Sequence, residues 1–93
     1  MFRRRRTLTC PAGVWTTVIH TPFAQLPATW TLRLVADRGA VAGEFEESKS
    51  SWVFPGTPRT GPLQPEMVFE RGYWNTFYTL RFRPVETVTV TIE

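Results

Sequence analysis

Residue types that do chemistry in proteins are few in this 93-residue chain, and they are scattered. There is one histidine, His20, and one cysteine, Cys10, ten residues before it. Metal sites are built from clustered histidine, cysteine and carboxylate side chains, so we predict no metal site and no cofactor. The acidic residues Glu44, Glu46 and Glu47 lack the aspartate-rich loop of a calcium site, and we expect them to form a solvated strand edge.

Nucleophilic catalysis has equally few candidate residues. A serine triad would need His20, Asp37 and one serine from residues 48–51, and none of these serines stands in a Gly-x-Ser-x-Gly turn. A dyad of Cys10 and His20 is the other arrangement, but a lone cysteine on a strand is more often a packed side chain than a nucleophile. We therefore predict that the protein is not an enzyme.

The most conspicuous charged feature is a run of four consecutive arginines, Arg3, Arg4, Arg5 and Arg6. They account for the net charge of +3, because the rest of the chain holds seven basic and eight acidic side chains. We interpret residues 1–7 as a basic N-terminal arm that contacts a partner. Four charges bind nucleic acid weakly, with a salt slope of about −3 to −4, so nucleic acid is a possible partner and a protein subunit is the expected one.

Aromatic side chains form a second candidate surface. On the last long strand, alternation places Tyr73, Phe77 and Arg81 on the face opposite Trp74. We expect Trp74 and Trp30 to face the core, which leaves the other three as an exposed aromatic–arginine stripe. Such a stripe is typical of a protein interface.

A third candidate is the segment 55–65, which contains four prolines and two glycines. This composition excludes a helix or a central strand and predicts a long, semi-extended loop. Proline lowers the entropy lost when an extended segment is ordered, so the loop suits an arm laid along a neighbouring subunit. The contact residues expected in it are Pro55, Pro58, Arg59, Pro62 and Pro65.

The elements that position these residues are β-strands. Apolar and polar residues alternate along much of the chain, and 14 of its residues are threonine, which favours strands. The expected strands are 14–20, 28–36, 41–46, 51–54, 66–71, 73–83 and 85–93, with a polar loop at 47–50.

Six to eight short strands joined by Gly/Pro turns predict an all-β fold. We expect residues 8–93 to form one compact antiparallel β-sandwich, Greek-key or jelly-roll-like. A small OB-like β-barrel is the alternative.

In size and layout the chain resembles the small accessory proteins of virus and phage capsids. The resemblance implies a non-enzymatic structural protein of the virion, such as a decoration, cement or minor capsid protein. Its partners would be other copies of itself or the major shell protein, with assembly in the host cytoplasm. The arginine run is followed by a polar, proline-containing segment, so we expect neither a cleaved export signal nor a membrane partner.

Two other functions stay open. A nucleic-acid-binding small β-barrel would place Arg81 and Arg83 with the arm on phosphates. Tyr73 and Phe77 would then stack on bases, although the near-neutral body of the chain disfavours this. A carbohydrate-binding β-sandwich would use tryptophan or tyrosine as a platform, but the chain has only one asparagine and one aspartate for sugar hydroxyls.

Overall fold

A computed structural model describes residues 5–23 and 26–93 of the chain, and these residues form an all-β structure, as predicted. The strands are β1 (Arg6–Cys10), β2 (Thr16–Thr21), β3 (Ala28–Ala36), β4 (Gly43–Ser50), β5 (Arg59–Pro62), β6 (Glu66–Arg71), β7 (Phe77–Pro84) and β8 (Val88–Ile92). Over these two ranges no helix is long and apolar enough to cross a membrane.

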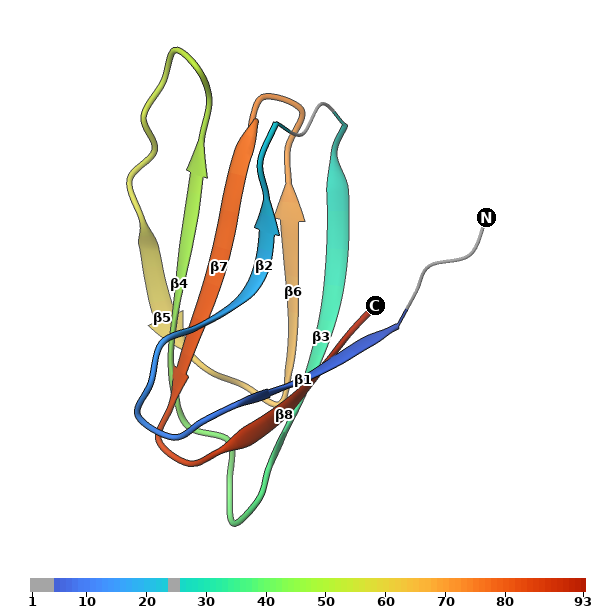
Figure 1. Cartoon of the computed structure of the whole chain (residues 1–93), viewed down its shortest axis with the longest axis vertical. Coiled ribbons are helices and arrows are strands. Elements are labelled where there is room, and N and C mark those ends of the chain that lie inside the picture. Colours follow the sequence, from blue (N-terminus) through green and yellow to red (C-terminus); the bar gives the residue numbers. More distant parts are fainter. Residues whose placement is uncertain (1–4, 24–25) are drawn as a thin grey trace.

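The strands form two antiparallel four-stranded sheets that face each other as a sandwich (Figure 1). One sheet has the order β1-β8-β3-β6 and the other the order β2-β7-β4-β5. The antiparallel pairs β1–β8, β2–β7 and β3–β6 are thus nested around the β4–β5 hairpin, the strand order of a jelly roll. The sandwich is confirmed, and the sheets do not close into the alternative barrel.

Alternation along the strands builds the core. On β7 the inward residues Tyr78, Leu80 and Phe82 are all fully buried. Val88, Val90 and Ile92 of β8 face the core, as expected. Trp30 of β3 also packs on the core, where its ring stacks on that of Tyr78 at 5.1 Å. Each fully buried apolar side chain of this size contributes about 1.5–3 kcal/mol to folding.

The sequence predicted a loop at 47–50 followed by a strand at 51–54, and the structure shows the reverse. The segment 47–50 continues β4, whereas 51–54 is a tight turn and not a strand. In that turn the Ser51 N–H donates to the Phe54 carbonyl at 3.0 Å, and the Ser51 hydroxyl accepts the N–H groups of Val53 and Phe54. A serine hydroxyl that bonds its own backbone in this way favours a turn over a strand.

The strand predicted at 73–83 begins only at Phe77. Residues 72–76 form a turn in which the Asn75 side chain accepts the Gly72 N–H at 2.8 Å and the Asn75 N–H donates to the Gly72 carbonyl at 3.2 Å. The alternation of β7 therefore does not extend to Trp74. Its side chain is 78% exposed, so the prediction that it packs in the core is wrong.

Both predicted arms contribute to the sheets. β1 begins at Arg6, so the last two residues assigned to the N-terminal arm pair with β8. β5, at 59–62, lies within the predicted loop 55–65 and is the edge strand of its sheet. An edge position tolerates proline because one side of the strand needs no backbone donor.

Candidate functional site

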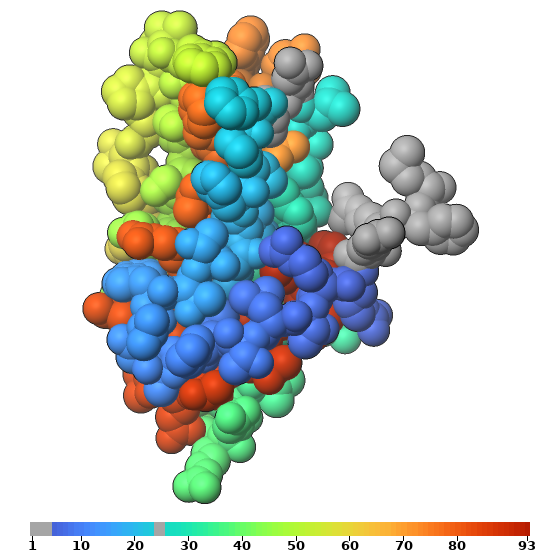
Figure 2. Space-filling view, viewed as in Figure 1, coloured from blue at the N-terminus to red at the C-terminus, as the bar shows by residue number. Residues whose placement is uncertain are grey.

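The β2–β3, β4–β5 and β6–β7 loops, 22–27, 51–58 and 72–76, lie at one end of the sandwich (Figures 1 and 2). Exposed apolar side chains gather on these loops. Of the eleven large hydrophobic side chains that are exposed in the described ranges, seven lie in these loops. They are Phe23, Leu26, Trp52, Val53, Phe54, Tyr73 and Trp74. The three loops contain no charged residue. We call these seven residues the loop-end patch.

Aromatic contacts tie the loops of this patch together. The rings of Phe23 and Trp52 lie 5.8 Å apart, and both pack on Phe77 at the start of β7, at 5.5 and 5.0 Å. Tyr73 and Trp74 meet edge to face at 5.4 Å. Ring contacts of this kind add about 0.5–1.5 kcal/mol beyond area burial. The first three contacts connect the 22–27 and 51–58 loops to the start of β7.

A hollow of about 500 Å³ lies within the patch, between the β4–β5 and β6–β7 loops. It is lined by Ser51, Trp52, Val53, Phe54, Trp74 and Thr76. The Ser51 hydroxyl already accepts two backbone N–H groups, and most of the other lining side chains are apolar. We call this site the tryptophan hollow, and its chemistry suits an apolar, uncharged group.

The β4–β5 loop, which supplies four of the six residues that line this hollow, is pressed against its own sheet. At Gly56, a Cβ atom would lie 1.5 Å from the carbonyl oxygen of Lys49. Only glycine allows so close an approach between two backbone segments. The segment Pro55-Gly56-Thr57-Pro58 is therefore held in place on the surface, with all four residues exposed.

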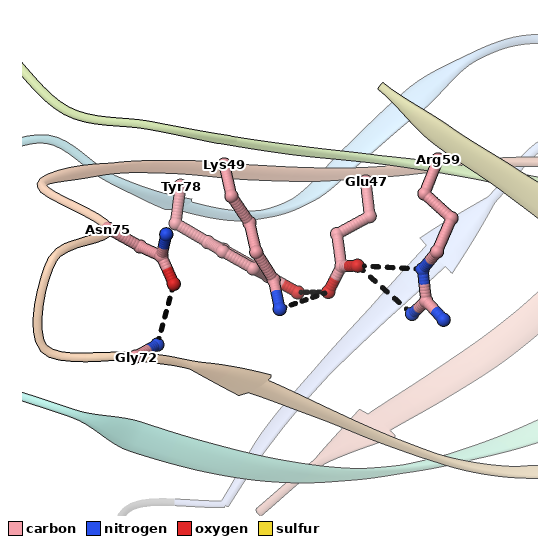
Figure 3. Close-up of polar contacts among 6 residues, drawn as sticks. All are labelled: Glu47, Lys49, Arg59, Gly72, Asn75 and Tyr78. Atoms are coloured by element: carbon pink, nitrogen blue, oxygen red, sulfur yellow. Dashed lines mark hydrogen bonds and ion pairs between the residues drawn. The ribbon is translucent and has the colours of Figure 1, made fainter. Parts of the chain in front are cut away.

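A buried carboxylate with an exposed and a half-buried cation partner lies among β4, β5 and β7 (Figure 3). Glu47 is only 3% exposed, because β4 continues past residue 46 and its alternation turns this side chain inward. The Tyr78 hydroxyl donates to Glu47 Oε2 at 2.6 Å, and Arg59 donates to Oε1 from Nε at 3.0 Å. Lys49 Nζ lies 3.9 Å from Oε2. Glu47 is thus a cross-link between strands, and the prediction of a solvated edge is wrong for this residue.

The environment of this cluster also changes the acidity of the tyrosine. Burial and, second, the hydrogen bond to Glu47 raise the pKa of Tyr78 above its ordinary value. The hydroxyl therefore stays a proton donor at neutral pH.

The outer face of the second sheet carries paired charges. Arg81 bonds Glu46 and Arg83 bonds Glu44, directly across the β4–β7 pair. Both guanidinium groups also lie over the ring of Trp15, at 5.1 and 4.9 Å from its centroid. Arg81 and Arg83, which the nucleic-acid alternative placed on phosphates together with the arm, are thus each matched by a carboxylate.

The predicted aromatic–arginine stripe is not one surface. Tyr73 lies in the 72–76 turn and Phe77 supports the loop-end patch, whereas Arg81 lies against Trp15 and Glu46. The prediction of the stripe assumed one unbroken strand over 73–83. The turn at Asn75 interrupts it, so Tyr73 is not on the strand that carries Phe77 and Arg81.

Part of the arginine run is attached to the body of the domain. Arg5 Nε donates to the Glu93 carboxylate at 2.9 Å, and Arg6 donates to the carbonyl of Val18. Arg3 and Arg4 lie outside the described residues.

The residues predicted in the Pro-rich segment have different roles. Pro55 and Pro58 are exposed; Pro55 directly follows Phe54 of the tryptophan hollow, and Pro58 directly precedes β5. Arg59 pairs with Glu47 and lies over the Phe45 ring, 5.3 Å from its centroid. Pro62 belongs to the edge strand β5. The carbonyl of Pro65 accepts the N–H of Leu34 at 2.8 Å, so this end of the segment is part of the framework.

The structure also shows the surroundings of Cys10 and His20, the two residues considered as a catalytic dyad. Cys10 is fully buried, and burial raises the pKa of its thiol to about 11, which keeps it protonated at neutral pH. His20 Nδ1 lies 3.1 Å from the Thr79 hydroxyl. In the part of the chain that the structure describes, no three side chains of His, Cys, Asp or Glu are grouped to hold a metal ion.

Comparisons with protein families, with curated proteins and with solved structures find no match to this chain. Fold and surface define its class: a jelly-roll β-sandwich with an uncharged aromatic loop end. Phe23, Trp52 and Phe54 are members of the patch that sequence reasoning missed as interface residues. The signal for them was present, because each of the three turn segments combines aromatic residues with proline or glycine and lacks any charge.

Proposed function

We propose that this protein is a non-enzymatic structural component of a large protein assembly, of the kind formed by the accessory proteins of virus and phage particles. It docks on a neighbouring protein subunit through the loop-end patch. The observation that carries this proposal is the concentration of seven exposed apolar residues on three loops without a single charge.

A surface of this composition favours a protein partner. Interface centres are depleted of charged residues and enriched in tryptophan, tyrosine and phenylalanine. Contiguous exposed apolar surface on a soluble domain marks an interaction site. Trp52 and Trp74 are 73% and 78% exposed, and buried tryptophans are among the residues that contribute most to binding.

The arginine run adds a second contact in this proposal. Arg5 and Arg6 are attached to the domain, and Arg3 and Arg4 immediately precede them in the sequence. As guanidinium groups they suit bidentate pairing with carboxylates of an acidic neighbour.

The experiment is co-sedimentation with the native particle from the protein's source, with and without nuclease. We expect wild-type protein to sediment with a large, nuclease-resistant particle. The double variant Trp52→Ser/Trp74→Ser should be incorporated at least tenfold less. The matched control Val35→Thr/Val85→Thr alters side chains that are 67% and 68% exposed outside the patch, and it should be incorporated normally.

Three results would overturn the proposal. Full incorporation of the tryptophan double variant would show that the patch is not the docking surface. Slow sedimentation of the wild-type protein as a monomer or small oligomer would exclude a shell component. A fast fraction that collapses on nuclease treatment would indicate nucleic acid as the partner.

A further inference from the structure

We infer that the subunit bound by the loop-end patch is a second copy of this chain, and that residues 55–58 of each copy lie in the tryptophan hollow of the other. This inference rests on the proposed function and names the partner at the same surface.

The hollow and the segment are chemically complementary. Trp52 and Trp74 line the hollow, and aromatic-lined grooves are the surfaces that bind extended proline-containing peptides. Pro55 and Pro58 stand three positions apart, the spacing that places both rings on one side of a polyproline II segment with three residues per turn. Such a segment loses little conformational entropy on binding because proline already restricts its backbone.

The hollow cannot be filled by the segment of its own molecule. Phe54 lines the hollow and Pro55 follows it directly, but the chain at Gly56 is held against the carbonyl of Lys49. The segment is therefore presented beside the hollow and directed away from it. The hollow is therefore open to a segment from another molecule.

The tryptophan hollow and the segment 55–58 are adjacent in the chain, and this adjacency suits a dimer with two-fold symmetry. In such a dimer both copies use the same patch. If the segment of the first copy contacts the hollow of the second, the segment of the second copy contacts the hollow of the first. When a hollow and its ligand segment are neighbours in sequence, one interface can satisfy both copies at once.

The absence of charged residues in the three loops also favours association between two copies of the chain. Close to a two-fold axis each charged group lies near its own copy, and like charges in that position oppose binding. The loops 22–27, 51–58 and 72–76 carry none, whereas the outer face of the second sheet carries the charges of Arg81, Arg83 and their partners.

The patch is also large enough. Its five aromatic side chains are 62–78% exposed and together present about 700 Å², since each carries about 150–250 Å². A standard interface buries about 800 Å² on each partner. Ring contacts and the Ser51 turn fix the loops beforehand, which reduces the ordering cost of association.

The first test is sedimentation velocity of the purified chain over a concentration series. We expect wild-type protein to form a dimer. Both Trp74→Ser, which opens the hollow, and Pro55→Ser/Pro58→Ser, which changes the segment, should weaken the dimer at least tenfold. The control Val35→Thr/Val85→Thr should dimerise as the wild type does, and thermal melts establish that every variant is folded.

The second test mixes the two defective variants. The Trp74→Ser chain keeps a normal segment, and the Pro55→Ser/Pro58→Ser chain keeps a normal hollow, so a mixed dimer contains one complete contact. We expect the mixture to associate more tightly than either variant alone. An equal affinity in the mixture would overturn the reciprocal arrangement.

Two further outcomes would overturn the inference. A wild-type chain that stays monomeric up to about 1 mM does not form the proposed dimer. If such a chain still needs Trp52 and Trp74 for incorporation into the particle, the docking function stands and the partner is a different protein. A monomer that floats with vesicles of phosphatidylcholine and phosphatidylserine, and fails to do so without the tryptophans, would assign the patch to a membrane surface.

Discussion

Removal of a single hydroxyl group, in Tyr78→Phe, tests how much the buried cluster around Glu47 contributes to stability. The hydroxyl donates to Glu47 Oε2 at 2.6 Å, and both side chains are at most 3% exposed. A hydrogen bond to a charged group contributes about 1.5–3 kcal/mol. Without the hydroxyl, this oxygen keeps only Lys49 Nζ at 3.9 Å, so little of the loss is compensated. We expect the free energy of unfolding to fall by about 2 kcal/mol.

The assay is urea and thermal denaturation at neutral pH. For a domain of this size 1 kcal/mol corresponds to about 4–8 °C, so the Tm should fall by about 8–16 °C. Tyr73→Phe removes the same group from a tyrosine that is 62% exposed, and it should change stability by less than about 0.5 kcal/mol.

A double-mutant cycle with Glu47→Gln isolates the pairwise contribution. Residues in one hydrogen-bond network show coupling energies of about 0.5–3 kcal/mol, and we expect a value between about 1 and 2 kcal/mol here. The reasoning is refuted if Tyr78→Phe unfolds with the wild-type free energy, or if the two substitutions are additive.

Three smaller predictions follow from other contacts. Because burial raises the pKa of Cys10 from 9.0 to about 11, the stability that its protonated form confers is complete below pH 9 and is lost between pH 9 and 11. This loss is about 2–3 kcal/mol in alkaline unfolding curves. Cys10→Ala should lack this part and keep the alkaline destabilisation that the raised pKa of Tyr78 causes. Gly56→Ala should destabilise the domain by more than about 1 kcal/mol in urea unfolding, since its Cβ would meet backbone at 1.5 Å. Gly72→Ala meets only a side-chain oxygen, at 3.1 Å, and should cost less; equal costs would contradict the reasoning. Glu93→Gln breaks the exposed pair with Arg5 and should change the Tm by only a few degrees, a change that 0.5 M salt should reduce.

Fold class was predictable because alternation and turn residues are local signals. β3 and β6 have the predicted bounds, and the inward faces of β3, β7 and β8 follow from period two. Burial of the lone cysteine was predictable because a lone cysteine is usually a packed, small hydrophobic side chain. These features depend on each residue and its near neighbours, which sequence reasoning can evaluate.

Errors arose where a polar side chain decided the local structure. The hydrophobic run 51–54 has strand composition, but the Ser51 hydroxyl bonds the backbone into a turn. Asn75 has the same effect at 72–76 and moves Trp74 from the expected core to the surface. Lys49 and Glu47 stand in a polar run that looks like a loop, yet partners on β5 and β7 stabilise it as strand.

The sequence by itself determined the class of this protein: an all-β domain, near neutral apart from its first residues, with few residues suited to chemistry. Only the tertiary structure decided where its function is to be sought. The loops 22–27, 51–58 and 72–76 are far apart in the chain, and the jelly-roll order brings them to one end. The physical reason is that strand pairing between distant segments places the loops, and no local pattern specifies which strands will pair.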